Sequence, residues 1–167
     1  HALEAYVSVN ANDFSDALAE KAATLVFRFL PAAYKNGEDL EAREKMHNAA
    51  CLAGLAFNSA GLGLCHGIAH AVGGKLPRPH GQANAIALPH IVHYNANLHA
   101  RRGAVHPVAA KKYRRMAKLL GLPSSSVTVG VSQLARAVEQ LNKSLQIPRG
   151  LQAAGCDIAL LRAELPD

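Results

Sequence analysis

The sequence contains no tryptophan, and aromatic residues make up only 5% of it. It has no run of about eighteen apolar residues, so no stretch predicts a transmembrane helix. The amino end lacks a basic segment followed by an apolar core, and therefore no secretory signal peptide is indicated. The sequence also contains no GxGxxG or similar phosphate-binding glycine loop, so nothing in it predicts a dinucleotide-binding fold.

Cysteine is scarce and shows no pairing pattern. Cys51, Cys65 and Cys156 are an odd number of thiols, and no two of them form a CxxC pair. This usage is typical of reduced thiols in a cytoplasmic protein. Cys65 adjoins His66, but adjacent helical residues point about 100° apart. We therefore leave this thiol out of the candidate site.

The charge balance is basic, with a net charge of +6 and a cationic run, KKYRRMAK, at 111–118. Nucleic-acid binding is one interpretation of such a run. The solvated face of a helix is the interpretation that we favour, because few aromatic residues accompany the charges and no nucleic-acid-binding motif is present. We accordingly expect neither a nucleic acid nor a membrane as a partner.

Apolar residues recur at helical spacing, and no alternating strand pattern stands out. Leu18, Ala22, Leu25 and Phe29 illustrate the spacing, and Pro31 is expected to end their helix. The 167 residues suffice for one domain with a sizeable core. The sequence therefore predicts an all-α protein built as a helical bundle.

Local signals predict where several of these helices begin and end. Asp13 or Ser15 is expected to cap the helix that carries Leu18, and Asp39 to begin the next long one. Farther along, the pair Gly73–Gly74 is expected to end a helix, and Gln82 to begin another.

The stretch 61–89 holds three histidines among glycines and prolines. His66 and His70 are four residues apart, so on a helix they share one face. A loop rich in glycine and proline can return His80 toward that face, and converging imidazoles suit a transition metal. A histidine pair without cysteine or an HExxH pattern is weak evidence alone, so structural roles stay open. The later histidines share no spacing and are expected at the surface or in a polar core: His90, His93, His99 and His106.

Three blocks of this sequence closely resemble the iron-containing, or group III, alcohol dehydrogenases: HALEAYVS at 1–8, GLGLCHGIAHAVGG at 61–74 and PHGQANAIALPHIV at 79–92. The blocks occur in the order and spacing of that family, and the resemblance continues through IPRGLQAAGC at 147–156. It implies that residues 1–167 form the C-terminal helical metal-binding domain of a dehydroquinate synthase-like fold, without the N-terminal dinucleotide-binding domain.

The resemblance also implies roles for individual residues. His1, His66 and His80 match metal ligands, and the family's aspartate ligand would lie four residues before His1, outside the printed sequence. His70 matches a histidine beside the nicotinamide, which implies a catalytic and cofactor-binding role, and His80 is also implied near the cofactor. Phe57 matches a position that faces the substrate, although a core role for it is equally open.

The activity implied by the resemblance is a metal-dependent, NAD- or NADP-linked interconversion of a primary alcohol and an aldehyde. The family implies Fe(II), but imidazole ligands generally bind zinc more tightly, so zinc is an alternative. We expect this chain to supply the metal and substrate half of the site, to be inactive alone, and to act with the missing N-terminal domain in a homo-oligomeric, cytoplasmic parent.

Three other functions stay open on the sequence alone. Three histidines and a water form the ligand set of some zinc hydrolases, which would act without NAD(P). If His1 were the mature terminus of a secreted protein, its amine and imidazole could chelate Cu(II) without catalysis. A bare helical interaction domain, with a vestigial site, is the third.

Overall fold

The structure is a computed structural model that describes residues 1–75, 79–98, 107–157, 159 and 163. Over these residues it contains helices and no strand, which confirms the all-α prediction. The helices are α1 (Ala2–Val7), α2 (Asp13–Lys35), α3 (Leu40–Ala60), α4 (Leu64–Lys75), α5 (His80–Ala96), α6 (Pro107–Leu119) and α7 (Val127–Ser144).

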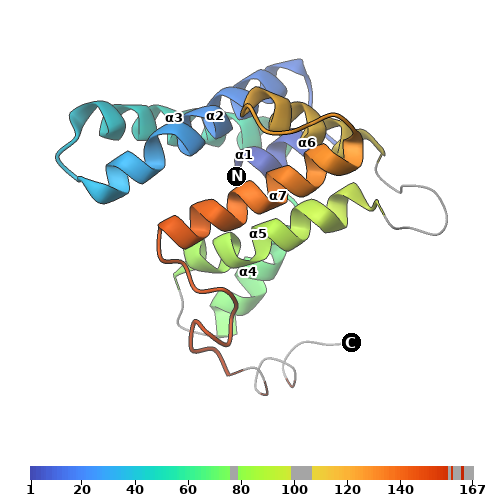
Figure 1. Ribbon diagram of the computed structural model, residues 1–167. Helices are drawn as coiled ribbons and strands as arrows, with labels where there is room; N and C mark the ends of the chain where they lie inside the picture. The colour runs from blue at the N-terminus through green and yellow to red at the C-terminus, as the bar shows by residue number, and fades with distance from the viewer. Residues whose placement is uncertain (76–78, 99–106, 158, 160–162, 164–167) are drawn as a thin grey trace.

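Neighbouring helices pair into three hairpins, α2–α3, α4–α5 and α6–α7. Helix α5 also packs against α7, which joins the second hairpin to the third (Figure 1). The short helix α1 contacts α2, α3 and α6, so the first residues of the chain lie in the middle of the molecule. This placement brings the amino end close to the start of α4.

The core consists of two clusters, and both contain many alanines. The larger cluster includes the buried side chains of Tyr6, Tyr113, Met116 and Leu134. The smaller one joins α4 and α5 to the segment 151–156. Small side chains allow helix axes to approach closely, which suits a chain with few aromatic residues to fill its interior.

Polar side chains satisfy the free backbone N–H groups at several helix starts. Asn12, rather than Asp13 or Ser15, is the N-cap of α2, and its side chain accepts from the N–H of Ser15 at 3.1 Å. The Ser15 hydroxyl accepts in return from the Asn12 N–H at 2.9 Å, which completes a reciprocal capping box. Helix α3 begins next to Asp39, close to the predicted start, and Asp39 is its N-cap.

Three helix boundaries differ from the sequence prediction. Helix α2 continues through Pro31 to Lys35, and α4 runs through Gly73–Gly74 to Lys75. Helix α5 begins at His80, two residues before Gln82. His80 therefore lies in the first turn of a helix rather than in a loop.

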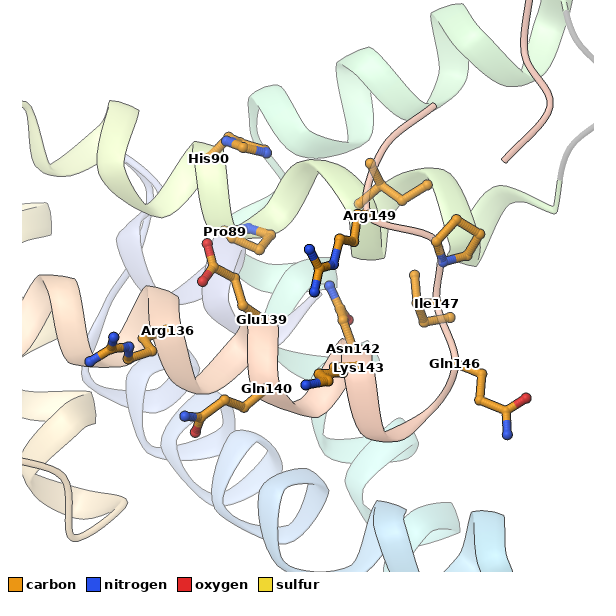
Figure 2. Close-up of a pocket in the computed structure, with 12 residues that line it drawn as sticks. Pro89, His90, Arg136, Glu139, Gln140, Asn142, Lys143, Gln146, Ile147 and Arg149 are labelled. Atoms are coloured by element: carbon orange, nitrogen blue, oxygen red, sulfur yellow. The ribbon is translucent and has the colours of Figure 1, made fainter. Parts of the chain in front are cut away.

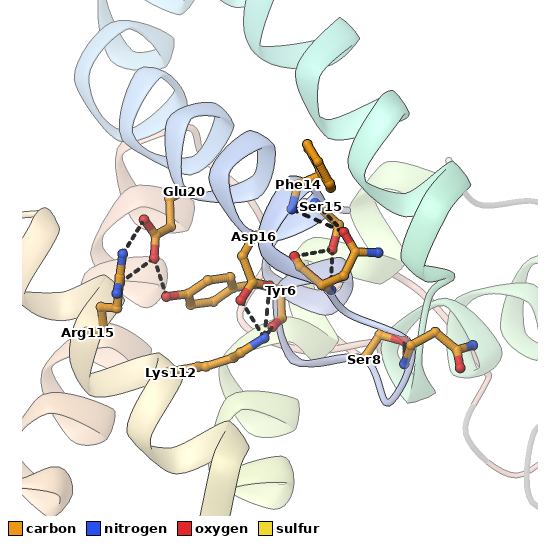
Figure 3. Close-up of polar contacts among 10 residues, drawn as sticks. Tyr6, Ser8, Phe14, Ser15, Asp16, Glu20, Lys112 and Arg115 are labelled. Atoms are coloured by element: carbon orange, nitrogen blue, oxygen red, sulfur yellow. Dashed lines mark hydrogen bonds and ion pairs between the residues drawn. The ribbon is translucent and has the colours of Figure 1, made fainter.

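The cationic run forms part of α6, and two of its members pair with α2 (Figure 3). Lys112 Nζ lies 2.7 Å from the Asp16 carboxylate and 2.8 Å from the backbone oxygen of Tyr6. Arg115 pairs with Glu20, whose carboxylate also accepts from the Tyr6 hydroxyl. These contacts tie α1 to α2 and α6.

No single helix among the described residues is long and apolar enough to cross a bilayer. The segments Leu40–Ala60 and Leu64–Gly73 together have the length and composition of a membrane span, but they are bent by 103° relative to each other.

Candidate functional site

The candidate site lies where α1, α3, α4 and α5 meet. His1 precedes α1 and stacks on Phe57 of α3, with ring centroids 4.7 Å apart. His66 and His70 lie in the first two turns of α4, and His80 lies at the start of α5. The structure thus brings together all five residues that the sequence singled out, although they come from four different helical segments.

His1 and His66 contact each other through their ring nitrogens. The two Nε2 atoms are 3.1 Å apart, and the ring centroids are separated by 4.4 Å. Two imidazole nitrogens bound to one tetrahedral ion, each about 2.0–2.1 Å from it, lie about 3.4 Å apart. The observed spacing is close to this value, so the His1–His66 pair fits a transition-metal ion.

The opposite side of the His66 ring contacts Glu4. This carboxylate is 2% exposed, and its Oε2 pairs with His66 Nδ1. Its Oε1 accepts from the backbone N–H of Cys65 at 2.7 Å. A carboxylate on one imidazole nitrogen is the usual partner of a metal-binding histidine, because it leaves the other nitrogen free to bind.

His80 lies beside the pair but is held differently. Its ring centroid is 5.3 Å from that of His66 and 4.9 Å from that of His70, on which it stacks. Asn84 Nδ2 lies 3.1 Å from His80 Nε2, while Asn84 Oδ1 is buried and has no partner among the described residues. That unpaired oxygen is an acceptor available to a ligand.

No group of three or more His, Cys, Asp or Glu side chains stands ready to hold a metal ion in the part of the chain that the structure describes. The reason is visible at His80, whose ring packs on His70 and contacts Asn84 instead of reaching the His1–His66 point. The residues therefore fit a metal at two imidazoles, and His80 would have to turn to provide a third.

Cys65 does not join the imidazoles. Its thiol is buried and donates to the backbone oxygen of Asn84 at 3.4 Å. Burial, followed by the nearby Glu4 carboxylate, raises the pKa of the Cys65 thiol to about 12. A group that stays protonated at neutral pH is a poor metal ligand, because the thiolate is the form that binds.

A separate hollow of about 590 Å³ lies between α5, α7 and the segment 146–149 (Figure 2). His90, Arg136, Glu139, Lys143 and Arg149 supply its charged lining, and all five residues are exposed. It contains none of the clustered histidines, and its mixed, solvated charges indicate no particular chemistry. His93 is likewise exposed on α5, whereas His99 and His106 lie outside the described residues.

The chain is similar to known proteins over most of its length. A sequence model of the "Fe-containing alcohol dehydrogenase family, C-terminal" matches residues 1–161. The chain belongs to the iron-containing alcohol dehydrogenase family. It is 49% identical over 150 residues to a 1-propanol dehydrogenase of Citrobacter freundii, covering 89% of this chain and 38% of that protein.

Solved structures share the fold, and two of them illustrate the similarity. A 1,3-propanediol oxidoreductase matches with a TM-score of 0.84 and 37% identity, over 95% of this chain and 40% of the other. The sulfoacetaldehyde reductase of Bifidobacterium kashiwanohense, solved in complex with NAD+, matches with a TM-score of 0.77 and 26% identity, over 99% of this chain and 41% of the other. The chain thus spans about two fifths of the length of these relatives.

Glu4 and Asn84 are the two site residues that sequence reasoning missed. For Glu4 the available signal is a carboxylate one helical turn after His1 in HALE. Asn84 lies four residues after His80, the spacing at which two side chains meet on one helix face.

Proposed function

We propose that this chain forms the metal and substrate half of an alcohol dehydrogenase that interconverts a primary alcohol and an aldehyde with NAD or NADP. The observation that carries the proposal is the meeting of His1 and His66 at Nε2, beside His70 and His80, within blocks matched by the family. The relatives named above act on short alcohols or aldehydes, so a short-chain primary alcohol is the substrate class that we propose.

In this proposal the metal ligands are His1, His66 and His80. Neutral imidazoles donate well to Fe(II) and to Zn(II), and family membership favours iron. A divalent ion there would supply a Lewis acid that polarises the oxygen of the alcohol or the carbonyl of the aldehyde. The chain would contribute by orienting the three rings toward one point. The contact with Glu4 already orients the ring of His66.

His70 and Phe57 are proposed to act on the organic reactants. His70 is exposed and stacks beside His80, so a nicotinamide approaching from outside the bundle would meet its ring. There it would orient the cofactor or relay a proton to solvent. Phe57 stacks on His1 and offers an apolar surface to the carbon chain of the alcohol. The hydride would pass between substrate and nicotinamide, a reaction that the cofactor itself supports.

The test uses the full-length gene product, freed of metal by a chelator under anaerobic conditions. We expect 1-propanol oxidation to disappear in the metal-free protein and to return with Fe(II) or Zn(II), in the presence of NAD+ or NADP+. Oxidation that survives complete metal removal would contradict the proposal. Hydrolysis of a model ester without any nicotinamide would favour the metallohydrolase alternative, which the relatives do not support.

A further inference from the structure

Glu4 of α1 is buried against the first turn of α4, and both of its carboxylate oxygens have hydrogen-bond partners there. We propose that Glu4 is a positioning residue, whose carboxylate determines which nitrogen of His66 is available to the metal. The inference rests on the proposed function, because it assumes that His66 is a ligand. It adds a residue to the site without making that residue a ligand itself.

The two carboxylate oxygens of Glu4 bind neighbouring groups of α4. Oε1 accepts from the N–H of Cys65, one of the helix-start donors that have no partner inside the helix. Oε2 pairs with Nδ1 of the adjacent His66. The partners are 61 and 62 residues away in sequence, so this contact fixes α4 against α1 as well as orienting the ring.

The tautomer of His66 follows from this contact. When the Glu4 carboxylate is ionised it can only accept a hydrogen bond, so Nδ1 of His66 is then the donor and carries the ring proton. In a neutral imidazole Nε2 then has a free lone pair, and this atom lies 3.1 Å from Nε2 of His1. Glu4 therefore presents the ligand nitrogen of His66 before any ion arrives, and it lies on the other side of the ring from the proposed metal position.

The surroundings leave Glu4 little freedom. Tyr6, on the same short helix, is held through its hydroxyl by Glu20 and through its backbone oxygen by Lys112. A Cβ added to Gly63 would lie 3.0 Å from Glu4 Oε1, so the glycine avoids a tight contact with the carboxylate. Glu4 is 2% exposed, so its carboxylate does not serve to solvate the helix.

Glu4→Gln tests the inference with a side chain of the same shape. A glutamine has one acceptor oxygen, so it cannot accept from both the Cys65 N–H and His66 Nδ1–H. If its oxygen stays on the Cys65 N–H, its NH₂ group faces Nδ1 and favours the proton on Nε2. Glu20→Gln is the matched control, because it alters a carboxylate that anchors α1 without touching any imidazole.

Two measurements on the full-length gene product report the effect. The first is the dissociation constant for Zn(II), determined by competition with a chelator. We expect Glu4→Gln to weaken binding by about 10- to 100-fold, the usual cost of losing such a partner, and Glu20→Gln to stay within about twofold. The second is the ¹⁵N NMR spectrum of the metal-free protein, in which the His66 tautomer should shift from Nδ1–H toward Nε2–H only in Glu4→Gln.

The outcomes separate the inference from the proposed function. Wild-type protein that binds no Zn(II) overturns the metal proposal, while the NMR comparison still decides whether Glu4 sets the tautomer. Folded Glu4→Gln with the wild-type dissociation constant and tautomer overturns the inference. If Glu4→Gln does not fold, Gly63→Ala replaces it, since the added methyl displaces the carboxylate by a few tenths of an ångström. Wild-type Zn(II) affinity in folded Gly63→Ala would then overturn the inference.

Discussion

The hydroxyl of Tyr6 should make a measurable contribution to stability. Tyr6 is 1% exposed, and its hydroxyl donates to Glu20 Oε1 at 2.5 Å (Figure 3). Tyr6→Phe keeps the ring and removes only this bond, while Glu20 retains Arg115 at 2.6 Å. A hydrogen bond to a charged group contributes about 1.5–3 kcal/mol. In a folded unit of 167 residues that loss lowers the melting temperature by roughly 3–12 °C.

The pH dependence of the same variant follows from the pKa of Tyr6. Burial, followed by the hydrogen bond to Glu20, raises the pKa of the Tyr6 hydroxyl above its ordinary value. The neutral form is therefore favoured in the folded protein, and this contribution is fully present below the unfolded pKa of about 10. It is lost as pH rises beyond that value, so the wild-type advantage should be constant near neutrality and shrink in alkaline solution.

Thermal unfolding followed by circular dichroism measures both effects. Tyr34→Phe is the control, because Tyr34 is 53% exposed and its substitution should change stability by less than about 0.5 kcal/mol. A Tyr6→Phe variant that melts with the wild type at neutral pH would refute the reasoning. It would mean that a hydrogen bond from water to Glu20 replaces the one lost with the Tyr6 hydroxyl.

Two further predictions concern packing and thiol reactivity. Gly130→Ala places a Cβ 2.8 Å from the backbone Cα of Arg114, so overpacking of about 1–3 kcal/mol should outweigh the gain in helix propensity. A Cβ added to Gly54 meets no atom within 4 Å, so Gly54→Ala should instead stabilise the fold by about 0.5–1 kcal/mol in denaturant unfolding. Equal changes in stability for the two substitutions would contradict this reasoning. Cys51 is exposed and should be alkylated well before the buried Cys65, whose raised pKa also suppresses the thiolate, as mass spectrometry of a time course will report.

Sequence periodicity predicted the helices well but not all of their ends. Pro31 was expected to end α2, yet the helix continues for four more residues. Leu30 and Ala33 on α2 line one hollow with Met46 of α3, so contacts between the two helices extend to the end of the hairpin. Pro31 lacks the backbone N–H that a helical residue donates, so it removes one hydrogen bond from α2. It lies on the exposed side of α2, and the packing of α2 against α3 outweighs the loss of that bond.

The sequence predicts the site residues whose role follows from residue type and spacing. It does not predict those whose role depends on burial in the folded protein. His66 and His70 share a helix face because they are four apart, and this spacing is visible in the sequence. Glu4 owes its role to 2% exposure and to partners in α4, which are properties of the tertiary structure. The stacking of His80 on His70 likewise depends on how α4 and α5 pack, because His80 begins the second of these helices.

The central claim, that His66 is a metal ligand and His70 is not, is tested most directly by the metal content of two variants of the full-length gene product. His66→Ala removes the ring that meets His1 Nε2, so we expect it to lose the bound ion and all turnover. His70→Ala should retain the ion and show turnover reduced by about ten- to ten-thousand-fold, the range of a proton-transfer group. Loss of metal from His70→Ala together with retention by His66→Ala would contradict the assignment.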